Sequence, residues 1–236
     1  MAVNIGRGDN GTAIRFGSGV GHEVERVWHL EQVRPFLENP DSGGPGLIAR
    51  FYGGVARIQE RRVWERLHLE YGIVEIMPGV VGREWPAFPG HLHRGPQRTP
   101  FPAVLEVLHG EAGLYLQKDG SFDRIHEASI LWLRRPDRVL VPPGYAHVLM
   151  NCGPEVLVVA EVHSSATLVD FDEMARHRGA GYYLGPQGAR PNPHYRAHPP
   201  LRELRAALMA APGAGPQDLY QAVMAAPDRY RFLHPL

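Results

Sequence analysis

The sequence predicts an all-β fold, a barrel or double-sheet jelly roll, with a short helical appendage at its C-terminal end. Short apolar and β-branched runs recur at even spacing, and the 27 glycines and 22 prolines supply turns between them. After residue 170 this pattern stops. The expected strands span residues 47–52, 55–58, 73–77, 104–108, 113–117, 129–133, 138–141, 147–151 and 155–162.

The two ends of the chain differ from this central pattern. Residues 1–23 are rich in glycine and polar residues, which predicts an irregular arm, and residues 24–37 are expected to contain a short helix. Residues 61–70 favour a strand or a loop. Beyond the strands, residues 171–178 predict one or two helical turns, and residues 201–211 and 217–226 predict helices. The expected division is an arm at 1–23, a barrel domain at 24–198 and a helical extension at 199–236.

Composition limits the classes of partner. A chain of 236 residues is long enough to bury one sizeable core. Lys+Arg and Asp+Glu both number 25, and this balance argues against a nucleic-acid partner. Cys152 is the only cysteine, so no internal disulfide can form. No signal-peptide core and no run approaching about eighteen apolar residues is present, so we expect a cytoplasmic protein with no membrane partner.

Three histidines form the candidate metal site. Side chains alternate along a strand, so His91 and His93 face one way and Leu92 the other. His147 follows a Pro-Pro-Gly turn and begins an apolar run, so it can face back into the same barrel. Neutral imidazole is the commonest metal ligand. The pattern therefore predicts a divalent ion held by three histidines, and the spacing does not choose among Fe, Mn, Ni and Zn.

Four motifs in order resemble those of the cupin-type glucose-6-phosphate isomerases. They are Pro78-Gly79-x-Val81-Gly82-x-Glu84, Gly90-His91-x-His93, Gly110-x-x-Gly113-x-x-x-Gln117 and Val141-Pro142-Pro143-x-x-Ala146-His147-x-x-x-Asn151-x-Gly153. The resemblance covers residues 24–195. It implies a cupin double-stranded β-helix, a homodimer, a divalent metal on His91, His93, a glutamate and His147, and interconversion of glucose 6-phosphate with fructose 6-phosphate.

The sequence departs from that family at the glutamate. The expected position holds Ala103, and Glu106 lies three residues further on. Strand alternation puts Glu106 on the opposite face unless a bulge near residues 100–102 shifts the register. Gln97 and His109 are other candidates for the missing ligand.

A second departure concerns the phosphate. Where the family has threonines, this chain has Val74 and Phe88, whose side chains donate no hydrogen bond. Arg83, Arg94 and Arg98 are the alternative candidates, since a guanidinium can grip a phosphate with two hydrogen bonds.

Aldose–ketose isomerisation moves a proton between two carbons, so it needs a base as well as a metal. Glu84, Glu106 and Tyr145 are the candidate catalytic residues, and no spacing argument selects among them. The expected function is that of a metal-dependent isomerase of carbohydrate metabolism acting on a sugar phosphate.

Two other functions fit the same residues. Three neutral ligands without a carboxylate also suit an iron-dependent cupin dioxygenase, and Trp85, Phe88 and Phe101 would favour a less polar substrate. The third hypothesis is a non-catalytic cupin that binds a sugar or small molecule and keeps its metal as a structural element. An isomerase should work without oxygen, a dioxygenase should need iron and consume oxygen, and a binding module should do neither.

Overall fold

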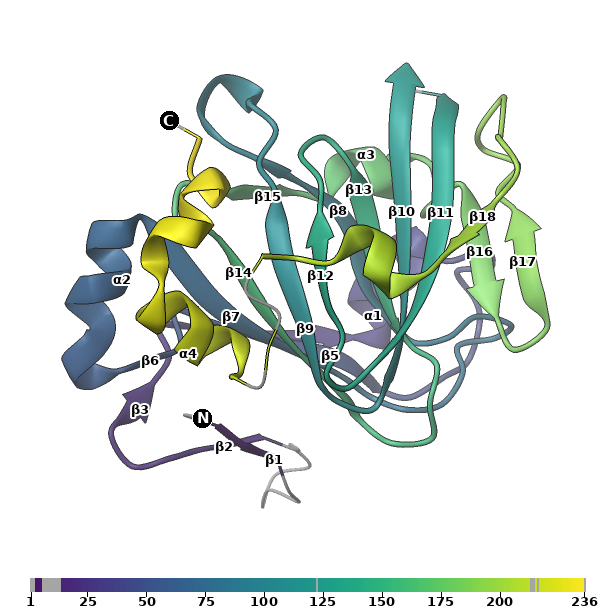
Figure 1. Ribbon diagram of the computed structural model, residues 1–236. Coiled ribbons are helices and arrows are strands. Elements are labelled where there is room, and N and C mark those ends of the chain that lie inside the picture. Colours follow the sequence, from purple (N-terminus) through teal and green to yellow (C-terminus); the bar gives the residue numbers. More distant parts are fainter. Residues whose placement is uncertain (1–2, 6–13, 122, 213–214, 216, 236) are drawn as a thin grey trace.

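The computed structural model describes residues 3–5, 14–121, 123–212, 215 and 217–235, and its centre is a pair of six-stranded sheets (Figure 1). One sheet has the order β15 (Leu168–Asp170), β8 (Ala87–Arg94), β13 (Ala146–Asn151), β10 (Glu111–Ser121), β11 (Arg124–Arg134) and β18 (Arg202–Leu204). The other has the order β12 (Arg138–Val141), β9 (Ala103–His109), β14 (Leu157–Ser164), β7 (Leu69–Ile76), β5 (Leu47–Gly53) and β4 (Val24–His29). Every pair is antiparallel except β11 with β18.

The two sheets enclose an apolar core built by strand alternation. Leu105 and Val107 of β9 and Val159 of β14 join Leu114 of β10 and Leu131 of β11 in one buried cluster. Because alternate residues of both sheets fill the space between them, the strands form a closed double-stranded β-helix. The predicted all-β cupin jelly roll is confirmed.

The N-terminal part contains one wrong prediction. Residues 61–70, expected as strand or loop, instead form the helix α2 (Arg61–Leu67), which ends at His68 with φ 53°. The helix buries Trp64 against Tyr71 and Tyr220, at ring-centroid distances of 5.9 and 5.1 Å. This partner from the far end of the chain stabilises a helix that the local pattern did not indicate.

Other short elements precede the barrel or connect its strands. The predicted arm contains β1 (Val3–Ile5), β2 (Ile14–Phe16) and β3 (Val20–Gly21), whereas its residues 1–2 and 6–13 lie outside the described part. The remaining elements are α1 (Leu30–Val33), η1 (Arg34–Phe36), β6 (Ala56–Arg57), η2 (Ile58–Glu60), η3 (Pro96–Arg98), α3 (Asp172–Arg176), β16 (Tyr182–Gly185) and β17 (Gly188–Pro191). The short helices expected within residues 24–37 and 171–178 are thus present as α1 and α3.

The C-terminal extension is only partly helical. Residues 201–211 do not form the single helix expected: β18 adds to the edge of β11, and the short 3₁₀ helix η4 (Ala206–Met209) follows. The edge strand β11 offers unpaired backbone groups, and Leu204 packs against the core. Strand pairing is therefore more stable here than the helix that the local sequence favours. The second predicted helix is present as α4 (Leu219–Ala225), capped by the Asp218 side chain, which accepts a hydrogen bond from the Gln221 backbone N–H.

The last helices pack on the barrel. Leu219 and Val223 of α4, with Tyr230 and Leu233 of η5 (Pro227–Leu233), join a second core cluster that includes Val162 of β14. Figure 1 shows α4 beside α2 on this face of the barrel. Within the described residues, no helix has both the length and the apolar character needed to cross a lipid bilayer.

Candidate metal centre

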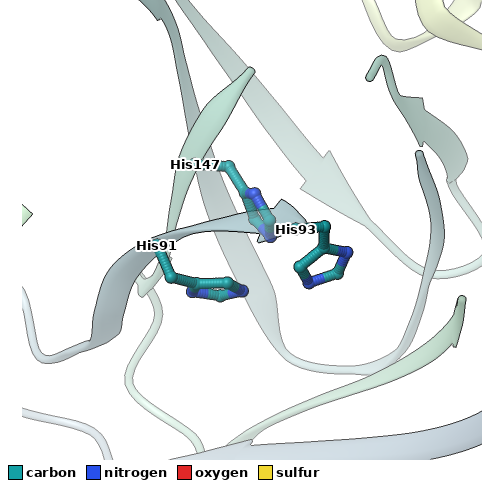
Figure 2. A group of neighbouring side chains, drawn as sticks. All are labelled: His91, His93 and His147. Atoms are coloured by element: carbon teal, nitrogen blue, oxygen red, sulfur yellow. The ribbon is translucent and has the colours of Figure 1, made fainter. Parts of the chain in front are cut away.

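The three predicted histidines meet inside the barrel. His91 and His93 come from β8 and His147 from its neighbour β13, where His147 pairs in register with His91. One nitrogen of each ring points toward the other two rings (Figure 2), and these atoms lie within 4.8 Å of one another. The three residues are only 4%, 4% and 2% exposed. The cluster therefore has the donor atoms, spacing and shelter of a metal site.

Two glycines allow this approach of the strands. A Cβ on Gly90 would stand 2.8 Å from Cγ2 of Val148 and 3.2 Å from Sδ of Met174, so a larger residue before His91 would push β8 away from β13. Gly144 has φ 81° in the turn that leads into His147, a conformation that glycine adopts without strain.

The protonation of the histidines suits metal binding. The carbonyl oxygen of Pro89 accepts a hydrogen bond of 2.8 Å from Nδ1 of His91, which leaves Nε2 of that ring with a lone pair. Burial lowers the pKa of His91 to about 4 and lowers the pKa values of His93 and His147 well below the usual range, with the neighbouring histidines adding to the effect. At neutral pH all three rings are neutral, which is the ligating form.

Some ring nitrogens of the cluster are buried without a hydrogen-bond partner, and they show whether a metal ion fits this site. Among the described residues, both ring nitrogens of His93 and Nδ1 of His147 are buried without a hydrogen-bond partner. Such a group costs about 1–3 kcal/mol when nothing satisfies it. A divalent ion on the converging nitrogens would satisfy the His93 lone pair, and three imidazoles suit Fe, Mn, Ni or Zn.

Two further polar residues face the histidines from β14, and sequence reasoning missed both. Oε1 of Glu161 lies 3.2 Å from Nε2 of His93 and 3.9 Å from Nε2 of His163. Glu161 and His163 are 6% and 5% exposed. The available signal was a second alternating pair, Glu161-x-His163, at the end of an otherwise apolar strand.

Glu106 does not reach this cluster, which corrects its place among the candidate catalytic and metal-binding residues. Its strand pairs regularly with β12 from Ala103 to Glu106, so no bulge reverses the alternation. Ala103 faces the barrel interior, whereas Glu106 faces outward. Its carboxylate accepts hydrogen bonds of 2.6 Å from Arg138 and 2.6 Å from the backbone N–H of Leu219.

Glu84 and Tyr145 also have their partners elsewhere. Glu84 lines a cavity of about 50 Å³ with Phe88 and Tyr183, among whose lining residues there is no histidine. Its carboxylate accepts a hydrogen bond of 2.9 Å from the backbone N–H of Glu38. The Tyr145 hydroxyl donates to Glu127 at 2.7 Å, and burial with this contact raises the pKa of Tyr145 to about 12.

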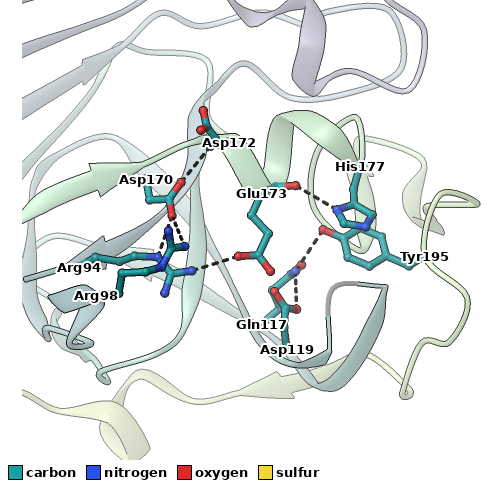
Figure 3. A network of polar contacts seen from close by, with 9 residues as sticks. All are labelled: Arg94, Arg98, Gln117, Asp119, Asp170, Asp172, Glu173, His177 and Tyr195. Atoms are coloured by element: carbon teal, nitrogen blue, oxygen red, sulfur yellow. Dashed lines mark hydrogen bonds and ion pairs between the residues drawn. The ribbon is translucent and has the colours of Figure 1, made fainter.

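Two of the three arginines suggested for phosphate binding already have carboxylate partners (Figure 3). Arg94 donates to Asp170 at 2.7 Å and to Glu173 at 3.1 Å, and Arg98 donates to Asp170 at 3.3 Å. Arg94 follows His93 directly, so alternation turns it toward the outer face of β8. The ion pairs tie β8 to β15 and α3 behind the histidine cluster.

Replacing Glu84 with glutamine should make stability less dependent on pH. Burial raises the pKa of Glu84 from its usual value near 4.5 to about 7, so the folded state favours the protonated carboxyl. The contribution of Glu84 to the unfolding free energy is therefore at its full value below pH 4.5, and it is lost as the pH rises from 4.5 to 7. We expect Glu84→Gln to exceed the wild type by about 3 kcal/mol in unfolding free energy at pH 8 and to match it near pH 4.5. Urea unfolding at both pH values measures this, and an equal difference at the two would contradict it.

Comparison with known sequences connects this site to a family. The family model described as "Glucose-6-phosphate isomerase (GPI)" matches residues 53–198, a range that contains all five polar residues at the centre. A protein of Rhizobium meliloti (strain 1021), named "Putative glucose-6-phosphate isomerase 2", is 28% identical over 128 residues, or 51% of this chain. The matched part spans 60% of that relative's length.

The solved structures that match this chain are more distant in sequence. A vicilin from Capsicum annuum is 12% identical with a TM-score of 0.39, over 55% of this chain and 32% of its own. An oxalate oxidase is 17% identical with a TM-score of 0.36, over 45% of this chain and 47% of its own. An oxalate decarboxylase from Bacillus subtilis is 19% identical with a TM-score of 0.37, over 50% of this chain and 26% of its own.

Proposed function

The chain belongs to the glucose-6-phosphate isomerase family, and we propose that it is a metal-dependent isomerase that interconverts the aldose and ketose forms of a sugar phosphate. The substrate pair would be glucose 6-phosphate and fructose 6-phosphate. One observation carries the proposal: the family match at residues 53–198 spans three buried histidines whose nitrogens converge. The resemblance also supports a homodimer with a role in carbohydrate metabolism.

His91, His93 and His147 would hold the metal. A bound divalent ion supplies a Lewis acid for the negative charge that develops on the sugar oxygens as a proton moves between adjacent carbons. The hydrogen bond from His91 to Pro89 orients that ring toward the site. Phe88 and Phe171 pack on His91 at ring-centroid distances of 5.5 and 5.4 Å and exclude water from this side.

The reaction also needs a group that accepts and returns a proton, and His163 is the side chain we propose for it. Its Nδ1 donates to the carbonyl oxygen of Ser164 at 2.8 Å, so Nε2 carries a lone pair. Its ring centroid lies 5.3 Å from that of His93, at the edge of the histidine cluster. Proton transfer between the two carbons requires a base within reach of the bound sugar.

Turnover by metal-reloaded protein tests the proposal. The protein is stripped of metal, reloaded separately with Mn, Fe(II), Ni or Zn under nitrogen, and given fructose 6-phosphate. We expect glucose 6-phosphate to form only with a metal, and His147→Ala to remove the activity. Full metal loading without turnover would rule out this reaction.

The aromatic wall beside His91 favours a second candidate, an iron-dependent dioxygenase acting on a less polar substrate. Phe88 and Phe171 line one side of three neutral imidazoles, a ligand set that also suits Fe(II). Iron-loaded protein would then take up oxygen with a suitable substrate, whereas an isomerase would not. A non-catalytic binding protein would show neither activity.

A further inference from the structure

We propose that Glu161 is the fourth ligand of the metal, so that β14 supplies the carboxylate of this site. The inference rests on the proposed metal centre at His91, His93 and His147. Its experiment uses metal affinity, and so does not depend on which reaction the protein performs.

The contact between Glu161 and His93 has the spacing of two ligands of one ion. Oε1 of Glu161 lies 3.2 Å from Nε2 of His93. Two atoms each bonded to a common metal at about 2.0–2.2 Å, at angles between octahedral and tetrahedral, lie roughly 2.8–3.6 Å apart. Despite the short distance, Nε2 of His93 makes no hydrogen bond of acceptable geometry within the described residues. The Glu161 oxygen is not among the donor atoms that all lie within 4.8 Å of one another, so sharing the ion requires its side chain to turn from His93 toward the other two histidines.

The electrostatics around the carboxylate point the same way. Among the described residues, the ion-pair partners of Glu161 are His93 and His163. Nδ1 of His163 donates to the carbonyl oxygen of Ser164, and Nε2 of His93 has no hydrogen-bond partner among the described residues. A buried carboxylate beside two ring nitrogens that do not hydrogen-bond to it costs free energy unless a cation lies among them. A divalent ion supplies that cation.

The register of β14 with β9 explains how a carboxylate on β14 can reach the metal site. This strand pairs with β9, where His163 is opposite Ala103 and Glu161 is opposite Leu105. Position 161 is therefore the diagonal neighbour of position 103, on the adjacent strand and the same interior face. Ala103 is fully buried and its methyl group leaves this side of the site to a longer side chain. Glu161 provides the carboxylate that position 103 does not.

Metal affinity in Glu161→Gln tests the proposal. Glutamine keeps the size of the side chain and removes its charge. We expect the Kd for Mn²⁺, measured by competition with a chelator, to rise at least about 10- to 100-fold, and the Mn²⁺ EPR spectrum of the bound ion to change. Glu75→Gln is the matched control, because Glu75 is a fully buried carboxylate on the adjacent strand β7 that pairs with Arg50 at 3.6 Å on the other face. It should leave the Kd unchanged once folding is verified by circular dichroism.

Glu161→Asp and His147→Ala, measured together with Glu161→Gln, distinguish the possible outcomes. Glu161→Asp retains the charge, and withdrawing its carboxylate by one methylene should weaken Mn²⁺ binding even if the glutamine variant does not fold. An unchanged Kd and EPR spectrum in the folded Glu161 variants, with binding lost in His147→Ala, would overturn the role of Glu161 alone. Unchanged binding in His147→Ala as well would instead overturn the histidine site on which the inference rests.

Discussion

Replacing His147 with alanine should abolish stoichiometric metal binding. The His147 ring forms a triangle with the other two histidines, at ring-centroid distances of 4.2 Å to His91 and 5.1 Å to His93. Its removal takes one neutral donor from a set whose three members are all buried. We expect the Kd for Mn²⁺ or Zn²⁺ to rise more than about 100-fold, because losing a ligand costs more than the 10- to 100-fold typical of its supporting partners. Elemental analysis after dialysis measures the retained metal.

His126→Ala is the matched control for this experiment. His126 is an exposed histidine on β11, outside the cluster of three. Its loss should leave the metal content at the wild-type value, and thermal unfolding should show both variants folded. Equal metal content in folded His147→Ala and wild-type protein would show that the metal is held elsewhere.

Among the variants described, Glu106→Ala should cause the largest decrease in the free energy of unfolding. Its carboxylate bonds to Arg138 and to the first N–H of α4, both at 2.6 Å, and both side chains of the ion pair are buried. The variant leaves the Arg138 guanidinium buried without this carboxylate, and removing one partner of a buried ion pair costs about 3–5 kcal/mol. For a chain of this size the melting temperature should fall by roughly 10 °C. Chemical denaturation and calorimetry measure the two quantities.

Arg138 also donates to the carbonyl oxygen of Gln217 at 2.8 Å, so Glu106 and Arg138 together attach the C-terminal extension to the barrel. Hydrogen exchange should therefore increase in residues 217–225 of Glu106→Ala before it increases in β8 and β13. Glu111→Ala, at an exposed position on β10, is the control and should change the unfolding free energy by less than about 0.5 kcal/mol. A similarly small change in Glu106→Ala would mean that the ion pair adds little beyond its cost of desolvation.

The local sequence pattern was sufficient to predict most strands of the barrel. Each strand carries its own alternation of apolar residues and its own glycine or proline turn, so the strands could be predicted without their partners. It failed at α2 and at residues 201–211. There the outcome depends on residues distant in sequence: Tyr220 stabilises α2, and the open edge of β11 recruits β18.

The same division holds for the metal centre. By itself the sequence determined the barrel, the three histidines and the outward direction of Glu106, because side-chain alternation along one strand is a local property of the backbone. Only the tertiary structure decided that Glu161 and His163 face those histidines. The distance between β14 and β8 depends on how the two sheets close around the core, and no spacing within either strand encodes it.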